Sequence, residues 1–117
     1  MKRKKDLKFS EYNIPKSKGK KREKLLTSYD LMKYFTVEYG SEDELFQIAN
    51  YILSGNPVLA NFNDVKVDKA NDMLAFISGV IYAKDGETHM ISDKLFLFGR
   101  KEDYEDGSLL QYIEDTK

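Results

Sequence analysis

The sequence predicts an α/β fold, a two-layer sandwich in which two helices pack on one face of a small mixed sheet. Segments rich in β-branched and aromatic residues alternate with two stripes of apolar residues at helical spacing. A turn sequence, Asp85-Gly86, separates two apolar runs in the second half of the chain. The expected order of elements is therefore β-α-β-α-β-β-β.

The first strand and the first helix have clear local signals. Residues 31–39, LMKYFTVEY, are rich in aromatic and β-branched residues and predict a strand. Ser41 and Glu44 form a capping box, S-x-x-E, directly before a helical pattern that Gly55 ends. The apolar stripe of this helix recurs every three or four residues: Leu45, Ile48, Ala49, Ile52 and Leu53.

The remaining elements follow in the second half of the chain. Residues 58–62 predict a short buried strand, and a second helix is expected to begin near Asp68, whose carboxylate can cap its first turn. Gly79 is placed where a glycine commonly follows the last helical residue. The stripe of this helix is Ala70, Met73, Leu74 and Ile77. Three strands are then expected, with turns at Asp85-Gly86 and Ser92-Asp93: residues 80–84, 87–91 and 94–99.

The strand at residues 95–98, LFLF, is apolar on both faces, because successive side chains of a strand point to opposite sides. One face can lie on the core of so small a domain, so we expect a partner protein to cover the other. Phe96 and Phe98 share one face, Leu95 and Leu97 the other, and the sequence leaves open which pair meets the helices. The acidic tail is expected to dock as a short last turn or strand through three apolar residues: Leu109, Leu110 and Ile113.

Charge divides the chain into two parts. Residues 1–24 hold eleven Lys or Arg and three Asp or Glu, a net charge of +8, whereas the remainder carries −9. We therefore predict a basic, largely disordered arm at residues 1–28 and a folded domain at residues 29–117. The arm is interpreted as a solvated tail, as a contact for anionic lipid or as a nucleic-acid contact, and lipid ranks above nucleic acid because the domain is acidic. The basic residues expected to meet an anionic surface are Lys2, Arg3, Lys4, Lys5 and Lys8.

Several classes of chemistry lack the residues that they need. The chain has no cysteine and a single histidine, His89, so neither a zinc site nor a catalytic triad is expected. No glycine-rich phosphate loop and no G-x-S-x-G nucleophile motif occurs. We therefore expect a protein that is not an enzyme and that uses no metal or cofactor.

Residues 34–113 resemble the SepF family, bacterial cell-division proteins that bind FtsZ. The order and spacing of four segments carry this resemblance. They are an E-x-x-x-I-A first helix, a V-x-x-N-F strand, a helix ending F-I-S-G, and an I-Y-A…G segment that leads into L-F-L, at residues 44–53, 58–62, 68–79 and 81–97.

The resemblance implies a cytoplasmic adaptor at the division site that binds the FtsZ C-terminal tail and promotes assembly of the Z-ring and septum. Family members form homodimers, some of which polymerise, and contact the membrane through their N-terminal region. By position, Met90 and Phe96 would bind the FtsZ tail and Gly79 would form contacts between dimers. Met90 stands where the family usually has a basic residue. The alternative from another class is a small nucleic-acid-associated dimer that uses its basic arm.

Overall fold

The computed structural model describes residues 25–117. In chain order, its elements are β1 (Lys33–Thr36), α1 (Glu42–Leu53), β2 (Val58–Asn61), α2 (Val67–Ala83), β3 (Glu87–Ser92), β4 (Leu95–Gly99), the 3₁₀ helix η1 (Lys101–Tyr104) and α3 (Ser108–Asp115). The strands form one sheet in the order β1-β2-β4-β3, in which β1 pairs in parallel with β2 and the other pairs are antiparallel. The predicted α/β class with a mixed sheet is confirmed.

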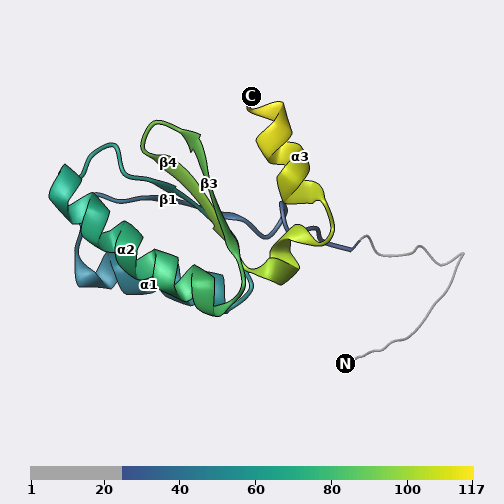
Figure 1. The fold of residues 1–117 in the computed structure, drawn as a ribbon, viewed down its shortest axis with the longest axis horizontal. Helices are drawn as coiled ribbons and strands as arrows, with labels where there is room; N and C mark the ends of the chain where they lie inside the picture. The colour runs from purple at the N-terminus through teal and green to yellow at the C-terminus, as the bar shows by residue number, and fades with distance from the viewer. Residues whose placement is uncertain (1–24) are drawn as a thin grey trace, which may run out of the picture.

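The main core lies between the sheet and the two long helices, which run side by side along one face (Figure 1). Phe98 of β4 and Ile48 of α1 are fully buried there, together with Ile77 of α2. Phe96 and Phe98 therefore face the helices, which settles the question that the alternating pattern of β4 leaves open.

The capping box at the start of α1 is confirmed. The Ser41 hydroxyl accepts a hydrogen bond from the Glu44 N–H at 3.3 Å, and the Glu44 carboxylate accepts one from the Ser41 N–H at 3.1 Å. The same carboxylate accepts a bond from the Glu38 N–H at 2.8 Å. Glu44 thus joins the segment after β1 to the first turn of α1, where negative charge is favourable.

The second helix is longer than predicted, and the strand expected at residues 80–84 does not form. Ile77 and Ile81 are one helical turn apart and both are buried, so the apolar stripe continues past Gly79. Gly79 is an exposed residue inside α2 rather than its end, at a cost of about 1 kcal/mol relative to alanine. Asp68 lies in the first turn and not at the N-cap position.

Two turns also differ from the prediction. Asp85-Gly86 connects α2 to β3 instead of joining two strands, although Asp85 does adopt the expected positive φ, 52°. Gly86 is needed for a different reason, because a Cβ there would collide with a backbone carbonyl oxygen of β4. The β3–β4 hairpin turns at Asp93-Lys94, one residue later than Ser92-Asp93, with Lys94 at φ 64°.

The second face of the sheet is covered by the chain's own C-terminal segment. Leu97 of β4 is fully buried in a cluster with Leu59, Tyr104 and Leu109. The expectation that a partner covers this part of the sheet is therefore wrong, because α3 and η1 supply the apolar side chains. The tail docks as a helix through Leu109, whereas Leu110 remains 45% exposed.

The start of the described chain is fastened to the start of α3. The Ser28 N–H donates to Asp106 at 2.8 Å, and the Tyr29 N–H donates to the Ser108 hydroxyl at 3.0 Å. The rings of Tyr29 and Tyr112 lie 5.6 Å apart. Hydrogen bonds from the backbone of Ser108 and of Ser28 lower the pKa of Asp106 to about 2. We call this set of contacts the terminal clasp.

Candidate binding groove

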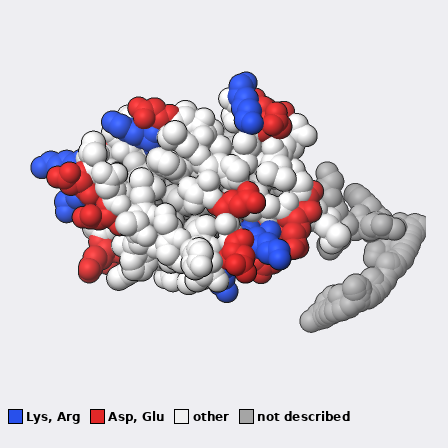
Figure 2. All heavy atoms as spheres, viewed as in Figure 1, with Lys and Arg blue, Asp and Glu red and all other residues white. Residues whose placement is uncertain are grey.

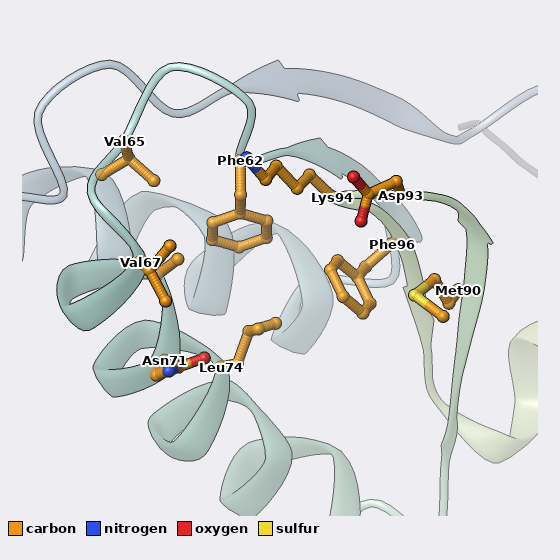
Figure 3. Close-up of a pocket in the computed structure, with 10 residues that line it drawn as sticks. Phe62, Val65, Val67, Asn71, Leu74, Met90, Asp93, Lys94 and Phe96 are labelled. Carbon is orange, nitrogen blue, oxygen red and sulfur yellow. The ribbon is translucent and has the colours of Figure 1, made fainter.

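A groove of about 140 Å³ opens between α2 and the β3–β4 hairpin (Figure 3). One wall is the first half of α2 and the other is the hairpin, while the loop before α2 closes one end. The α2 wall consists of Val67, Ala70, Asn71 and Leu74. The hairpin wall consists of Met90, Asp93, Lys94 and Phe96, and the closed end is formed by Phe62 and Val65.

The two residues predicted to bind a tail meet in this groove. Met90 and Phe96 are direct partners in the register of β3 and β4, so their side chains lie on the same face of the sheet. That face is the helix side, because Phe96 packs against the main core. Met90 is 67% exposed at the groove mouth. A half-buried aromatic ring beside an exposed methionine is a soft apolar contact surface.

Phe96 is held in place by two other rings. Its centroid lies 5.8 Å from that of Phe62 in an edge-on arrangement and 6.3 Å from that of Phe98 in a stacked one. Leu74 of α2 points toward the same space from the opposite wall (Figure 3). The groove floor is therefore apolar and already packed in the free chain, and a preformed surface lowers the entropy cost of binding.

Charge is sparse around the groove. Asp93 and Lys94 lie at one rim, and Asn71 is the polar residue of the α2 wall. On the face of the molecule drawn in Figure 2, charged side chains gather toward the two ends. Between these ends, an uncharged area covers much of α2 and of the hairpin. The groove is suited to apolar side chains of a peptide rather than to a phosphate group.

The C-terminal segment supports the hairpin from behind. The Tyr104 hydroxyl donates to the Glu87 carbonyl oxygen of β3 at 2.9 Å, and burial raises the pKa of Tyr104. Asp103 is only 4% exposed and accepts a bond from the Arg100 guanidinium at 3.0 Å. This hydrogen bond raises the pKa of Arg100. The strands that carry Met90 and Phe96 are thus braced on the face opposite the groove.

Gly79 does not line the groove. It lies on the exposed side of α2, one turn after Phe76, and a Cβ built on it meets no atom within 4 Å. Phe76 and Phe46 of α1 are both nearly half exposed, with ring centroids 6.0 Å apart. The two helices therefore present an apolar outer surface that contains Gly79 and Phe76. The five basic residues predicted to meet an anionic surface lie outside the described residues.

His89 lies on the opposite face of the hairpin from the groove. Its Nε2 atom is 2.8 Å from the Glu87 carboxylate, and its ring centroid is 5.6 Å from that of Tyr104. Within residues 25–117, no group of three His, Asp or Glu side chains is arranged to hold a metal ion. His89 is part of the packing between β3 and η1.

Sequence reasoning missed the α2 wall of the groove. The sequence pattern gives Val67 and Asn71 no role and places Leu74 in the core stripe of α2. Their spacing of four and then three residues is that of a single helix face. Because Val67 is 61% exposed at the helix start, this face extends beyond what the sheet covers. Two apolar residues of α2, Val67 and Ala70, precede the core residues Met73 and Leu74, and this extension of the apolar stripe toward the helix start is the signal that could have identified the wall.

The family model described as "Cell division protein SepF" matches residues 35–99, from β1 to the end of β4. The chain belongs to the SepF family. The match includes both strands of the groove and the whole of α2, but ends before η1 and α3. The C-terminal cover of the sheet therefore lies beyond the part that the family model describes.

Curated SepF proteins align with different lengths of the chain. A Cell division protein SepF of Natranaerobius thermophilus is 38% identical over 56 residues, which is 48% of this chain and 34% of that protein. The protein of the same name from Carboxydothermus hydrogenoformans is 27% identical over 101 residues, 86% of this chain and 74% of that protein. A third, from Symbiobacterium thermophilum, is 33% identical over 67 residues, 57% of this chain and 33% of that protein. The chain thus spans only a third of two of these SepF relatives.

None of the helices within residues 25–117 has the length and apolar character required to cross a membrane.

Proposed function

We propose that this SepF-family chain is a division adaptor that binds the C-terminal tail of FtsZ in the groove between α2 and the β3–β4 hairpin. By binding filament tails it would promote assembly of the Z-ring and septum at the division site, without a chemical step. The observation that carries the proposal is the direct pairing of Met90 with Phe96 on the groove side of the hairpin. The shape and low charge of the groove support an apolar peptide as the ligand.

Binding of a fluorescent peptide with the sequence of the host's FtsZ C-terminus tests this function, with a scrambled peptide as the control. We expect saturable binding of the first peptide only. Met90→Ala should weaken it about fivefold, because the removed side chain offers about 1 kcal/mol of apolar contact. Since Met90 is 67% exposed in the free protein, the variant should have the same melting temperature as the unmodified protein.

Tyr82→Ala is the matched control variant, because Tyr82 is 85% exposed and lies outside the groove. It should bind the peptide as the unmodified protein does. Phe96→Leu should weaken binding at a small cost in stability, whereas Phe96→Ala also removes ring contacts within the core. Equal binding by the Met90 and Tyr82 variants would place the tail elsewhere.

We also propose that the chain forms homodimers and that Gly79 allows close contact between dimers on the outer surface of α1 and α2. The free space around Gly79 and the exposed rings beside it support this. Gly79→Gln should raise the stability of the chain by about 0.5–1 kcal/mol through helix propensity, yet reduce the assembly size in sedimentation velocity. An unchanged assembly would remove Gly79 from the contact.

The basic arm is proposed to give a weak contact with anionic membrane near the division site. Each basic residue near such a surface contributes about 1 kcal/mol at low salt, and two arms in one dimer would add through avidity. Deleting residues 1–24 should lower sedimentation with vesicles that contain an anionic lipid. Unchanged sedimentation would exclude the arm from this contact. The described domain carries a net charge of −9, which does not favour the nucleic-acid alternative.

A further inference from the structure

We propose that the peptide in the groove is held as an added β-strand on the free edge of β3, an inference that rests on the proposed function. In the order β1-β2-β4-β3, β3 is the last strand, and within residues 25–117 no other strand lies along its outer side. Extended peptides bind such edges by main-chain hydrogen bonds while alternate side chains enter pockets. Met90 belongs both to this edge strand and to the lining of the groove.

The hydrogen-bond pattern identifies the residues that face this edge. The Phe62 N–H donates to the Lys94 carbonyl oxygen at 2.8 Å, in the register that pairs Ala60 with Phe96. Antiparallel partners alternate between hydrogen-bonded and non-hydrogen-bonded pairs. Phe96 therefore directs its backbone groups toward β2, and its pair with Met90 is a non-hydrogen-bonded one. Consequently, the N–H and C=O of Met90 point away from β4, toward the free edge.

Thr88 faces the same edge, two residues before Met90, because backbone direction alternates along a strand. In this register neither residue's N–H bonds to β4, and within residues 25–117 no turn, loop or cap hydrogen bond uses either N–H. The strand, ETHMIS, contains no proline and no lysine, the residues that commonly protect an edge. The register of β3 with β4 shifts between Met90 and Ser92, so the regular alternation of outward-facing residues stops there although Ser92 still pairs with Leu95. The edge thus offers two outward residues, enough for a short added strand.

Met90 connects this edge to the groove. Its backbone faces outward while its side chain lies on the helix side, at the groove mouth. A peptide residue paired with Met90 would place its own side chain on that side, toward Phe96 and Leu74. Its neighbours would point to the other face of the sheet. Every second side chain of the peptide therefore contacts the groove, and every second N–H of the peptide donates a hydrogen bond to β3.

Methylation of single peptide nitrogens tests this arrangement on the full chain. Each amide of the FtsZ C-terminal peptide is N-methylated in turn, and the dissociation constant is measured by fluorescence anisotropy. We expect losses of about tenfold at alternate positions and changes within about twofold at the positions between, because only alternate N–H groups face β3. Losses without a two-residue alternation would overturn the proposal while leaving groove binding intact. Failure of the unmodified peptide to bind would overturn the proposed function as well.

A variant of the edge gives the complementary test. Thr88→Pro removes an N–H that faces away from β4, so the hydrogen bonds between the strands are kept. Thr88→Val is the matched control, because it retains the N–H. We expect about tenfold weaker peptide binding for the proline variant alone, and equal affinities of the two variants would overturn the added strand. If Thr88→Pro does not fold, the methylation series decides.

A second copy of β3 is the competing occupant of the edge. Sedimentation velocity of the unmodified protein and of both Thr88 variants, without peptide, measures whether two copies pair through this edge. If the proline variant has a smaller assembly than the valine variant but the same peptide affinity, the edge pairs two copies and the proposal is overturned.

Discussion

Leu109 anchors α3 on the sheet, so Leu109→Ala tests whether the C-terminal segment covers the second face. The Leu109 side chain is fully buried in the cluster that contains Leu59 and Leu97. Leu110 is the next residue of the same helix and is 45% exposed. Leu110→Ala therefore deletes the same atoms from the same helix and serves as the matched control.

The magnitude follows from the difference in burial. Replacing a fully buried leucine by alanine costs about 3 kcal/mol, whereas the half-exposed neighbour should cost about 1 kcal/mol or less. The helix has 8 residues, too few to be stable without its packing. Once Leu109 is lost, α3 should leave the sheet and expose Leu97. A loss of about 3 kcal/mol in a domain of this size lowers the melting temperature by roughly 15 °C.

Far-UV circular dichroism in a urea titration measures the free energy of unfolding, because the chain contains no tryptophan. Amide hydrogen exchange adds a local measurement, with faster exchange expected in β4 and α3 for Leu109→Ala. If both leucine variants shift the urea midpoint equally, α3 does not pack on the sheet, and the cover of Leu97 must come from elsewhere.

Gly86→Ala should lower the free energy of unfolding by about 2 kcal/mol or more, since the new methyl group meets the Gly99 carbonyl oxygen. Gly79→Ala is the comparison, because its methyl group meets no atom and the change should be neutral or stabilising. Thermal unfolding measures both. The Asp106 pKa is lowered from 3.8 to about 2 on folding, so its contribution to stability is complete above about pH 4 and is lost as the pH falls through 2. Asp106→Asn should therefore show a shallower fall of the urea midpoint between pH 4 and pH 2, and an unchanged slope would contradict the clasp. Tyr104→Phe removes the hydroxyl's hydrogen bond to the Glu87 carbonyl oxygen of β3 and should lower the free energy of unfolding by about 1 kcal/mol in urea. An unchanged free energy would mean that this bond adds nothing beyond what a bond to water gives.

Local signals predicted the parts of the fold that local forces determine. The Ser41–Glu44 capping box and the stripe through Ile48 and Ile52 lie within one helix and needed no knowledge of the rest of the chain. No local signal singles out Met90 and Phe96 as binding residues. The family resemblance alone implies that role, and their pairing on one face of the hairpin is a finding of the structure.

Errors arose where a distant contact outweighs a local preference. Gly79 suggests a helix end, but burial of Ile81 under the sheet extends the helix beyond it. The apolar second face of β4 suggested a partner protein, because nothing near Leu97 in sequence indicates that Leu109 will cover it. The apolar residues of the tail indicate that it can dock on the domain, but the place where it docks depends on tertiary packing alone.

The terminal clasp has a geometric consequence for attachment. Residues 1–24 join the domain next to Ser28, whose N–H bonds to Asp106 just before α3, on the face of the sheet turned away from α1 and α2 (Figure 1). The groove opens on the other face, beside Met90. Whatever is held through the first 24 residues and whatever is held in the groove therefore attach to opposite sides of one sheet. Within the domain, a tension between the two attachments would pass across the strands, through β4 and the packing of Leu97 against Leu109.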